Sequence, residues 1–498
     1  MANRNNNYRK KKGNQNPNGT LSQQHQRFAS SSAIFTGTSS TTSASSVDET
    51  RLKSMLRDPA KNSYNVAMLS KSMTQVNGMY KQIVNYLSTS LTYDHLIYPM
   101  FQNPMVDAGD APTIQESFAQ TAIYVDKLNP KYNLPIFTEK LFINGVTYQY
   151  KLEDSKGIAY QDMPANLCRV AYLEEGVFRY QMDVTKLSDT SVLLYPKEIQ
   201  TAYNSYKAGN TDALVEGKYY QVSDKGMAFT IDPDVLVQAG QANPPLGSVL
   251  VDAIKVESAK DSMLSTDALD NTKIVHSTVP IDDKGRPTME LPVVQEYHNA
   301  LKRSLPAGAV AITNPFETKS VPLSGTGKSE KFGLLDKSIE QLYKSAGVSQ
   351  QLFAVENNSA NALERSLQVD TQWLYGVLLP LFANYYNYEL KKIGKKGNIQ
   401  WKIKFLNISH FDRADVVATA KDQLANGGSR LEYLAYCGMT PLEVANMLVF
   451  EQQVLGIDNL MVVKMTSHTM SGSDTATGRP ASQNPTDDTV RINDTQAQ

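Results

Sequence analysis

The sequence has few of the residues that usually build active sites. Its 498 residues include two cysteines, Cys168 and Cys437, two tryptophans and six scattered histidines. The cysteines are too few and too far apart for a disulfide framework or a zinc site, so we expect two buried thiols. We interpret Trp373 and Trp401 as core anchors. No Gly-x-Ser-x-Gly elbow occurs. Without a candidate nucleophile, base, metal site or cofactor, we do not expect an enzyme.

The sequence also lacks a long apolar run and an excess of charge of either sign. No stretch of about 18 apolar residues occurs, so neither a membrane span nor a membrane partner is expected. The N-terminal residues include no apolar segment typical of a secretion signal, so secretion is not expected. Lys and Arg total 49 against 50 for Asp and Glu, a net charge of −1. A protein that grips duplex DNA tightly usually has a basic surplus. The near equality of basic and acidic residues argues against a repressor or nuclease, but it suits a protein through which DNA must slide.

Some motifs that could belong to an active site favour a structural interpretation. Ser324–Ser329 (SGTGKS) is similar to a phosphate-binding loop, but Pro322 stands where the full pattern needs a glycine. The carboxylate pairs Glu174/Glu175 and Asp282/Asp283 fall in predicted turns, where such residues are common. A nucleotide-binding enzyme therefore remains only the less favoured alternative.

The first half of the chain combines helical and strand patterns. Residues 1–50 form a basic, polar tail, either solvated or in contact with nucleic acid or an acidic partner. Helical spacing is clearest in Ser70–Leu87 and Thr113–Leu128. Asn144-Gly145 predicts a hairpin within Lys140–Tyr150. A second hairpin is predicted between Cys168–Tyr172 and Val177–Met182. The fold class is therefore α+β and helix-rich.

A helix, a strand–helix–strand insertion and a second helix follow. The predicted order is a helix at Ser248–Leu269, a strand at Lys273–Val279, a helix at Leu291–Leu305, a strand at Ala309–Thr313 and a helix at Glu330–Ala346. The first helix carries a set of acidic residues that form either a solvated face or a lining that repels DNA phosphates. They are Asp252, Glu257, Asp261 and Asp267.

A polar break and a very long helix come next. Apolar residues within Asn357–Gly394 keep helical spacing, and Pro380 is expected to kink the helix because it removes a backbone donor. Short helices follow. Ser429 with Glu432, and Thr440 with Glu443, predict capping boxes at two of their starts.

This order of elements resembles the portal proteins of tailed bacteriophages, over roughly residues 51–465. The most specific part is Ser338–Leu390. There, Gly347–Phe353 is similar to the segment after the family's second stem helix, and Ala362–Ser366 through Leu379-Pro380 is similar to its long helix with a proline. A crown built from the remaining helices would be short.

The resemblance implies a closed homo-oligomeric ring, usually of twelve copies, at one capsid vertex. Double-stranded DNA would pass through it during packaging and ejection, with no cofactor. The large terminase and then the head–tail adaptor would dock on it, and the major capsid and scaffolding proteins would be further partners. The protein would be part of the virion, after assembly in the host cytoplasm. Another virion subunit, an adaptor or a capsid protein, is the main alternative.

The resemblance also divides the chain and assigns roles to residues. The divisions are the tail 1–50, the wing 51–245, the first stem helix 246–270, the clip 271–328, the second stem helix 329–347, the tunnel loop 348–361, the long kinked helix with wing return and short crown 362–465, and a polar tail 466–498. The DNA-facing residues would be Gln350, Gln351, Asn357, Asn358, Ser359 and Asn361. The partner-docking residues of the clip would be Asp282, Asp283, Lys284 and Arg286, and Pro380 would be the kink.

Overall fold

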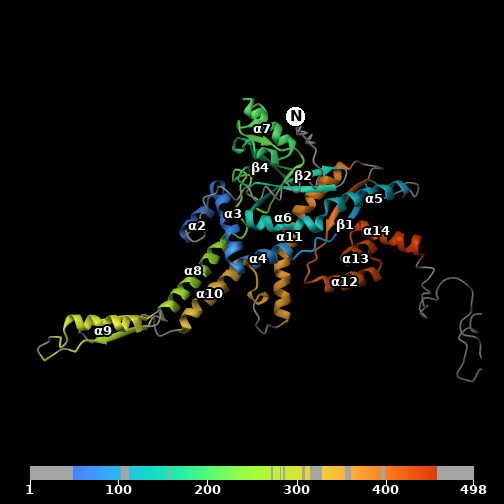
Figure 1. Ribbon diagram of the computed structural model, residues 1–498. Coiled ribbons are helices and arrows are strands. Elements are labelled where there is room, and N and C mark those ends of the chain that lie inside the picture. The colour runs from blue at the N-terminus through green and yellow to red at the C-terminus, as the bar shows by residue number, and fades with distance from the viewer. Residues whose placement is uncertain are drawn as a thin grey trace, which may run out of the picture. The chain divides into compact units, whose positions relative to one another are not determined.

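A computed structural model describes most of the chain (Figure 1). The described residues are 49–101, 111–154, 157–270, 273–280, 282–283, 287–304, 309–314, 328–353, 360–393 and 399–456. The chain divides into one compact unit that ends at Val444 and a second that begins at Ala445. The terminal tails predicted from the sequence lie outside the described residues, except for the last two residues of the first.

Helices dominate the start of the first unit. They are α2 (Glu49–Leu56), α3 (Pro59–Val76), α4 (Gly78–Thr89), α5 (Ala111–Leu128) and α6 (Pro130–Asn144). The sequence predicted one helix across Ser70–Leu87, but Asn77 divides it. The side chain of Asn77 accepts a hydrogen bond from the Tyr80 amide at 2.8 Å and so caps α4.

The hairpin predicted within Lys140–Tyr150 is wrong. Lys140–Asn144 is the last part of α6, whose buried side chains Leu134, Phe137 and Leu141 follow helical spacing. Gly145 has a φ of +82° and ends this helix rather than turning a hairpin. A glycine in the left-handed region is as typical of a helix C-terminus as of a two-residue turn, so the Asn-Gly signal was ambiguous.

A seven-stranded antiparallel sheet follows α6. Its strands run in the order β3-β2-β8-β5-β7-β6, and β4 pairs with β5 beside this path. The bounds are β2 Val146–Asp154, β3 Gly157–Met163, β4 Cys168–Glu174, β5 Val177–Asp183, β6 Leu214–Val215, β7 Tyr219–Gln221 and β8 Gly226–Thr230. The predicted β4–β5 hairpin is confirmed, with positive φ at Glu175 and Gly176. Between β5 and β6 lie the short turns η4 (Val184–Lys186) and η5 (Val192–Leu194) and helix α7 (Lys197–Lys207).

A separate two-stranded sheet joins distant parts of the chain. β1 (His95–Phe101) pairs antiparallel with β11 (Ile399–Phe405), and the sequence analysis did not identify either strand. The Trp401 side chain on β11 is buried and donates to the Ser117 hydroxyl at 2.8 Å, so its prediction as a core anchor is confirmed. Trp373 is 46% exposed, so that prediction is wrong. Cys168 is buried as expected, but Cys437 is exposed.

The rest of the chain includes one long helix. α8 (Gly247–Asp270), β9 (Lys273–Thr278), α9 (Leu291–Ser304), β10 (Ala309–Asn314) and α10 (Lys328–Ala346) follow the predicted order. After the turn η6 (Gln350–Leu352) comes α11 (Ala360–Lys392), whose buried side chains join the main core. The chain continues through α12 (Arg413–Ala425), α13 (Arg430–Tyr436), α14 (Pro441–Val449) and the π-helical turn η7 (Phe450–Leu455).

Both predicted capping boxes supply hydrogen bonds at helix starts. The Ser429 hydroxyl accepts from the Glu432 amide at 3.3 Å. Thr440 and Glu443 exchange two bonds, because the Thr440 amide donates to the Glu443 carboxylate at 2.7 Å and the Glu443 amide to the Thr440 hydroxyl at 3.3 Å. The starts of α13 and α14 are therefore as the sequence predicted.

Gly145 provides a direct test of the junction between α6 and β2. A Cβ at this position would lie 2.5 Å from the carbonyl carbon of Asn243, whereas at Gly209, with φ +83°, nothing lies within 4 Å. We expect Gly145→Ala to lower the free energy of unfolding by about 3 kcal/mol or more, and Gly209→Ala by only about 1 kcal/mol. Urea denaturation of both variants measures the difference. Equal losses would show that the close approach at Gly145 relaxes at little cost.

Candidate functional site

The two helices on either side of the inserted unit, α8 and α10, pack against each other (Figure 1). The first half of α8 is buried on several sides through Val249, Leu250 and Val256, and α10 contributes Leu342 and Tyr343. Near the top of the pair the Ser345 hydroxyl of α10 donates to the carboxylate of Asp252 on α8. The two helices are therefore fixed to each other and to the main core at one end.

The proposed acidic DNA lining of α8 is not supported at two of its four residues. Asp252 is 8% exposed and pairs with Lys255 at 3.3 Å as well as with Ser345. Glu257 accepts from Lys260 at 2.8 Å and from the Asn77 amide group at 2.9 Å. Their charges are therefore compensated inside one chain. Asp261 is exposed, and the side chain of Asp267 lies outside the described residues.

Beyond Glu257 the helix pair leaves the core, and large apolar side chains become exposed. Leu264 of α8 is 65% exposed and Leu334 of α10 is 58% exposed. Exposed apolar side chains on paired helices mark a surface that another protein could cover.

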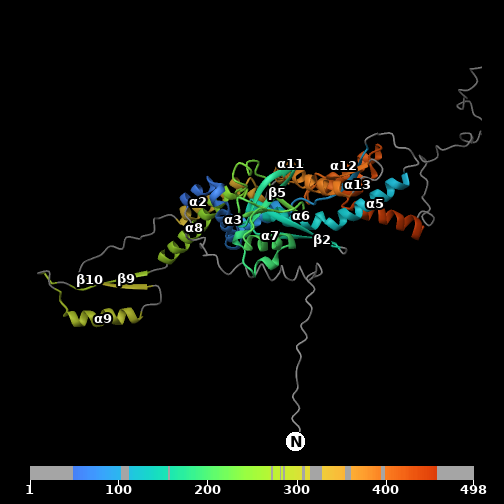
Figure 2. The ribbon, with the colours of Figure 1, turned by 90° about the horizontal axis from the view of Figure 1, so that it is seen from above.

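The inserted unit between the two helices is a parallel strand–helix–strand motif (Figure 2). β9 and β10 pair only with each other among the described strands. α9 lies along β10, and the His298 ring and Thr313 hydroxyl form a hydrogen bond of 2.9 Å. None of the 14 residues of α9 is buried, and its Leu291 and Tyr297 are 70% and 67% exposed.

The predicted docking residues fall in the connection between β9 and α9. Asp282 and Asp283 are exposed, and Lys284 and Arg286 lie outside the described residues. Their role as a docking surface stays a prediction.

The segment after α10 turns back onto the core. Gly347, with φ +68°, ends α10, Val348 is buried, and the Phe353 ring stacks on Tyr343 with centroids 5.2 Å apart. Gln350 on η6 is half-buried. The path from the helix pair to the candidate DNA-facing segment is therefore fixed by an aromatic stack.

The other predicted DNA-facing residues are only partly accounted for. Gln351 belongs to η6, and nothing is described of its side chain. Asn357, Asn358 and Ser359 lie outside the described residues. Asn361, predicted to be in the loop, has helical backbone because α11 already begins at Ala360. The loop predicted to end at residue 361 is therefore shorter by two residues.

The long helix α11 continues without interruption through Pro380, which is exposed. The kink at this residue stays a prediction. Before the proline the helix exposes Val369 and Trp373, whereas after it Phe382, Tyr385 and Tyr386 are buried. The helix therefore belongs to the core from Leu374 onward, and the turns before Leu374 are more exposed.

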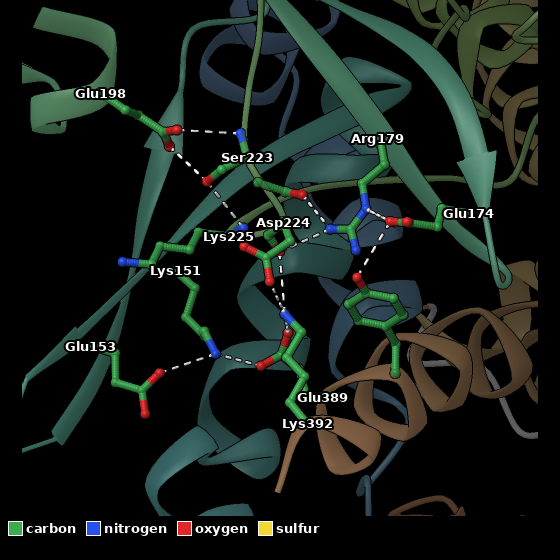
Figure 3. A network of polar contacts seen from close by, with 12 residues as sticks. Lys151, Glu153, Glu174, Arg179, Glu198, Ser223, Asp224, Lys225, Glu389 and Lys392 are labelled. Carbon is green, nitrogen blue, oxygen red and sulfur yellow. Dashed lines mark hydrogen bonds and ion pairs between the residues drawn. The ribbon is translucent and has the colours of Figure 1, made fainter. Parts of the chain in front are cut away.

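A buried ion pair fixes the core half of α11 to the large sheet (Figure 3). The Glu389 carboxylate is fully buried and accepts from Lys151 of β2, from Lys392 at 2.8 Å and from the Tyr124 hydroxyl at 2.9 Å. Burial has the largest single effect and would raise the pKa of Glu389, but the ammonium groups of Lys151 and Lys392 together outweigh it, so the pKa lies below its usual value. Burial would lower the pKa of Lys151, yet Glu389 raises it.

A second set of contacts reinforces this attachment. Arg179 of β5 is 1% exposed, donates to Glu174 at 2.7 Å and lies over the Tyr388 ring of α11 at 4.4 Å (Figure 3). Lys392 also pairs with Asp224 at 2.9 Å. Glu174, predicted as a turn residue, thus takes part in the sheet–helix contact. Nothing in the local sequence distinguished Lys151, Arg179 or Glu389 from ordinary surface charges.

The described ranges contain neither a candidate membrane span nor a candidate metal centre. There, no helix is both long and apolar enough to cross a membrane. The same part of the chain holds no cluster of three or more His, Cys, Asp or Glu side chains placed to bind a metal ion.

Comparisons with known proteins give a structural likeness only. No protein-family model and no curated protein matches the chain. It is similar to a chain of the virion of a native gene transfer agent particle, at 12% identity and a TM-score of 0.35, over 75% of this chain and 87% of the other. It is also similar to a chain from the neck of an empty gene transfer agent particle, at 12% identity and a TM-score of 0.39, over 71% and 88%.

A third similar structure is an HK97-family phage portal protein from Corynebacterium diphtheriae. The identity is 11%, the TM-score 0.28, and the match covers 68% of this chain and 94% of that chain. The chain is thus similar to particle, neck and portal structures. At TM-scores below 0.5 this likeness does not decide function, so the proposal below depends on the geometry of the chain itself.

The buried ion pair predicts a large effect of a small substitution. Glu389→Gln leaves Lys151 buried without its main partner, and we expect the free energy of unfolding to fall by about 3–5 kcal/mol. The control is Lys391→Ala, which breaks the exposed Lys391–Glu175 pair two residues along the same helix and should cost about 0.5 kcal/mol or less. Thermal and urea denaturation compare the two. Similar losses for both variants would contradict the anchoring role of Glu389.

Proposed function

We propose that this chain is a phage portal protein with a structural, non-enzymatic role. Copies of it close into a ring at one capsid vertex, and double-stranded DNA passes through the ring during packaging and ejection. The strand–helix–strand unit is the surface for the large terminase and later for the head–tail adaptor. By resemblance the ring has twelve copies.

The observation that carries this proposal is that α8, α10 and their inserted unit are incomplete as a single chain. A sheet of two strands is marginal on its own, and each strand leaves one edge without a partner among the described strands. α9 exposes Leu291 and Tyr297, and the helix pair exposes Leu264 and Leu334. These surfaces favour burial against another molecule.

Identical neighbours can supply that burial. Contacts between unlike faces of the same chain generate a closed ring whenever the rotation between neighbours closes. The helix pair is fixed to the core at its Asp252–Ser345 end and exposed beyond Glu257. It can therefore contact adjacent copies side by side without giving up its own attachment.

The charge of the chain supports passage of DNA rather than tight binding. The net charge is −1, and the segment proposed to face DNA begins with the neutral Gln350 and Gln351. Neutral polar groups can contact phosphates without releasing many counterions, so the contacts would be weak and not sequence-specific. Weak contacts suit a duplex that must move in both directions.

Ring formation is tested by placing a charge on the helix pair. Leu264→Lys should reduce assembly strongly, because it buries an unpaired ammonium against the neighbouring copy. Leu193→Lys is the control, since Leu193 is 64% exposed on η5 and Leu264 is 65% exposed. Sedimentation velocity should give a large particle for the wild type and the control, and smaller species for Leu264→Lys. Equal assembly of both variants would exclude this face from the interface.

Passage of DNA is tested separately by shortening the chain after Phe353. Removing Glu356–Ser359 should leave rings of normal mass and reduce the DNA retained in assembled particles several-fold. A variant with the four residues replaced by Gly-Ser-Gly-Ser controls for length. Loss of ring assembly in the deletion, or full DNA retention, would contradict the assignment of this segment to the channel.

A further inference from the structure

Two described parts of the chain flank the segment that the proposed function places next to DNA. One is the turn η6 with Phe353, and the other is the N-terminal half of α11. Both parts contact the same side chain of α4, Tyr86. This shared contact has no role in the ion-pair network that holds the core half of α11.

On the first flank, Tyr86 meets Phe353 edge to face. Their ring centroids lie 5.8 Å apart at an interplanar angle of 86°, which is a favourable aromatic geometry. The other neighbour of Phe353 is Tyr343 of α10, stacked on it at 5.2 Å. Phe353 is therefore held between the helix pair and α4.

On the second flank, the Tyr86 hydroxyl donates to the carboxylate of Asp370 on α11 at 3.1 Å. Asp370 is 8% exposed. Burial raises its pKa to about 6, and the hydrogen bond from Tyr86 acts in the opposite direction because it favours the charged carboxylate. A buried carboxylate without a hydrogen-bond donor is costly to desolvate, and the Tyr86 hydroxyl supplies that donor to Asp370.

The contacts at Tyr86 are not duplicated by the neighbouring tyrosine of α11. The Tyr375 hydroxyl donates to Asp412 at 2.8 Å, in the connection before α12. That bond also ties α11 to the rest of the core, but it does not involve Phe353. Tyr375 therefore offers a matched control of the same chemistry.

We propose that Tyr86 is a positioning residue that holds both flanks of the DNA-facing segment, Phe353 through its ring and Asp370 through its hydroxyl. The inference depends on the proposed function for its consequence, since the flanks set where the segment leaves the core beside the DNA. The clamp itself is a property of the chain that can be measured without DNA. Removing the ring releases both flanks, whereas removing only the hydroxyl releases the Asp370 flank.

Hydrogen exchange of the purified full-length protein tests the clamp. In Tyr86→Leu, amide exchange in both Val348–Phe353 and Arg365–Thr371 should accelerate about tenfold or more. In Tyr86→Phe, only Arg365–Thr371 should accelerate. In Tyr375→Phe, Val348–Phe353 should keep its wild-type rates. Acceleration of a single flank in Tyr86→Leu, or the same pattern in Tyr375→Phe, would overturn the clamp.

Should Tyr86→Leu fail to fold, Tyr86→Phe and Asp370→Ala carry the test. Both should accelerate Arg365–Thr371 and leave Val348–Phe353 unchanged, and a rate increase at both flanks or at neither would overturn the division of roles. DNA retention in particles built with Tyr86→Phe then separates the two proposals. Reduced retention with rings of normal mass supports the positioning role. Unchanged retention despite accelerated exchange overturns it, while failure of the wild type to form rings would contradict the portal function itself.

Discussion

The carboxylate of Glu389 lies fully buried against the ammonium of Lys151, and the position of α11 depends on this contact. A buried charge pair is costly to desolvate and stabilises a fold only when its remaining hydrogen-bonding capacity is used. Here Lys392 and the Tyr124 hydroxyl use it for Glu389, and Glu153 lies 3.1 Å from Lys151. The pair therefore fixes one register between the helix and the large sheet, because a shift of the helix along the sheet would leave both charges buried without a partner.

That fixed register gives the two halves of α11 different roles. The half after Pro380 is part of the core, together with Phe382 and Tyr386. Leu374, Leu378 and Leu379, which precede the proline, are buried in the same core, whereas the earlier turns expose Val369 and Trp373. In those turns Asp370 accepts a hydrogen bond from Tyr86. The two ends of the helix therefore differ in how much of their surface the core covers.

The sequence predicted most local features because their signals are local. The capping residues Ser429 and Thr440, the turn at Glu175-Gly176 and the order from α8 to α10 all follow from patterns within a few residues. Asn144-Gly145 led to the wrong prediction of a hairpin, because the same dipeptide is found both at helix C-termini and in hairpin turns. Trp373 misled because a large aromatic residue at helical spacing does not reveal which side of a helix faces the core.

Long-range pairing could not be predicted from one sequence. β1 and β11 pair His95 with Phe405, and Lys151 and Glu389 are 238 positions apart. Asp252 and Glu257 each pair with a lysine of the same helix, Lys255 and Lys260, but their further partners Ser345 and Asn77 lie on other elements. The helix pair of the candidate site was therefore predictable, whereas the burial of Asp252, its bond to Ser345 and the contacts of Tyr86 required the structure.

A three-dimensional reconstruction by electron microscopy of the purified protein tests the central claim most directly. The account predicts a closed ring in which α8 and α10 of neighbouring copies enclose an opening wide enough for duplex DNA, with Gln350–Phe353 on the inner side. A single copy in solution, or a ring with Gln350–Phe353 on its outer surface, would contradict it.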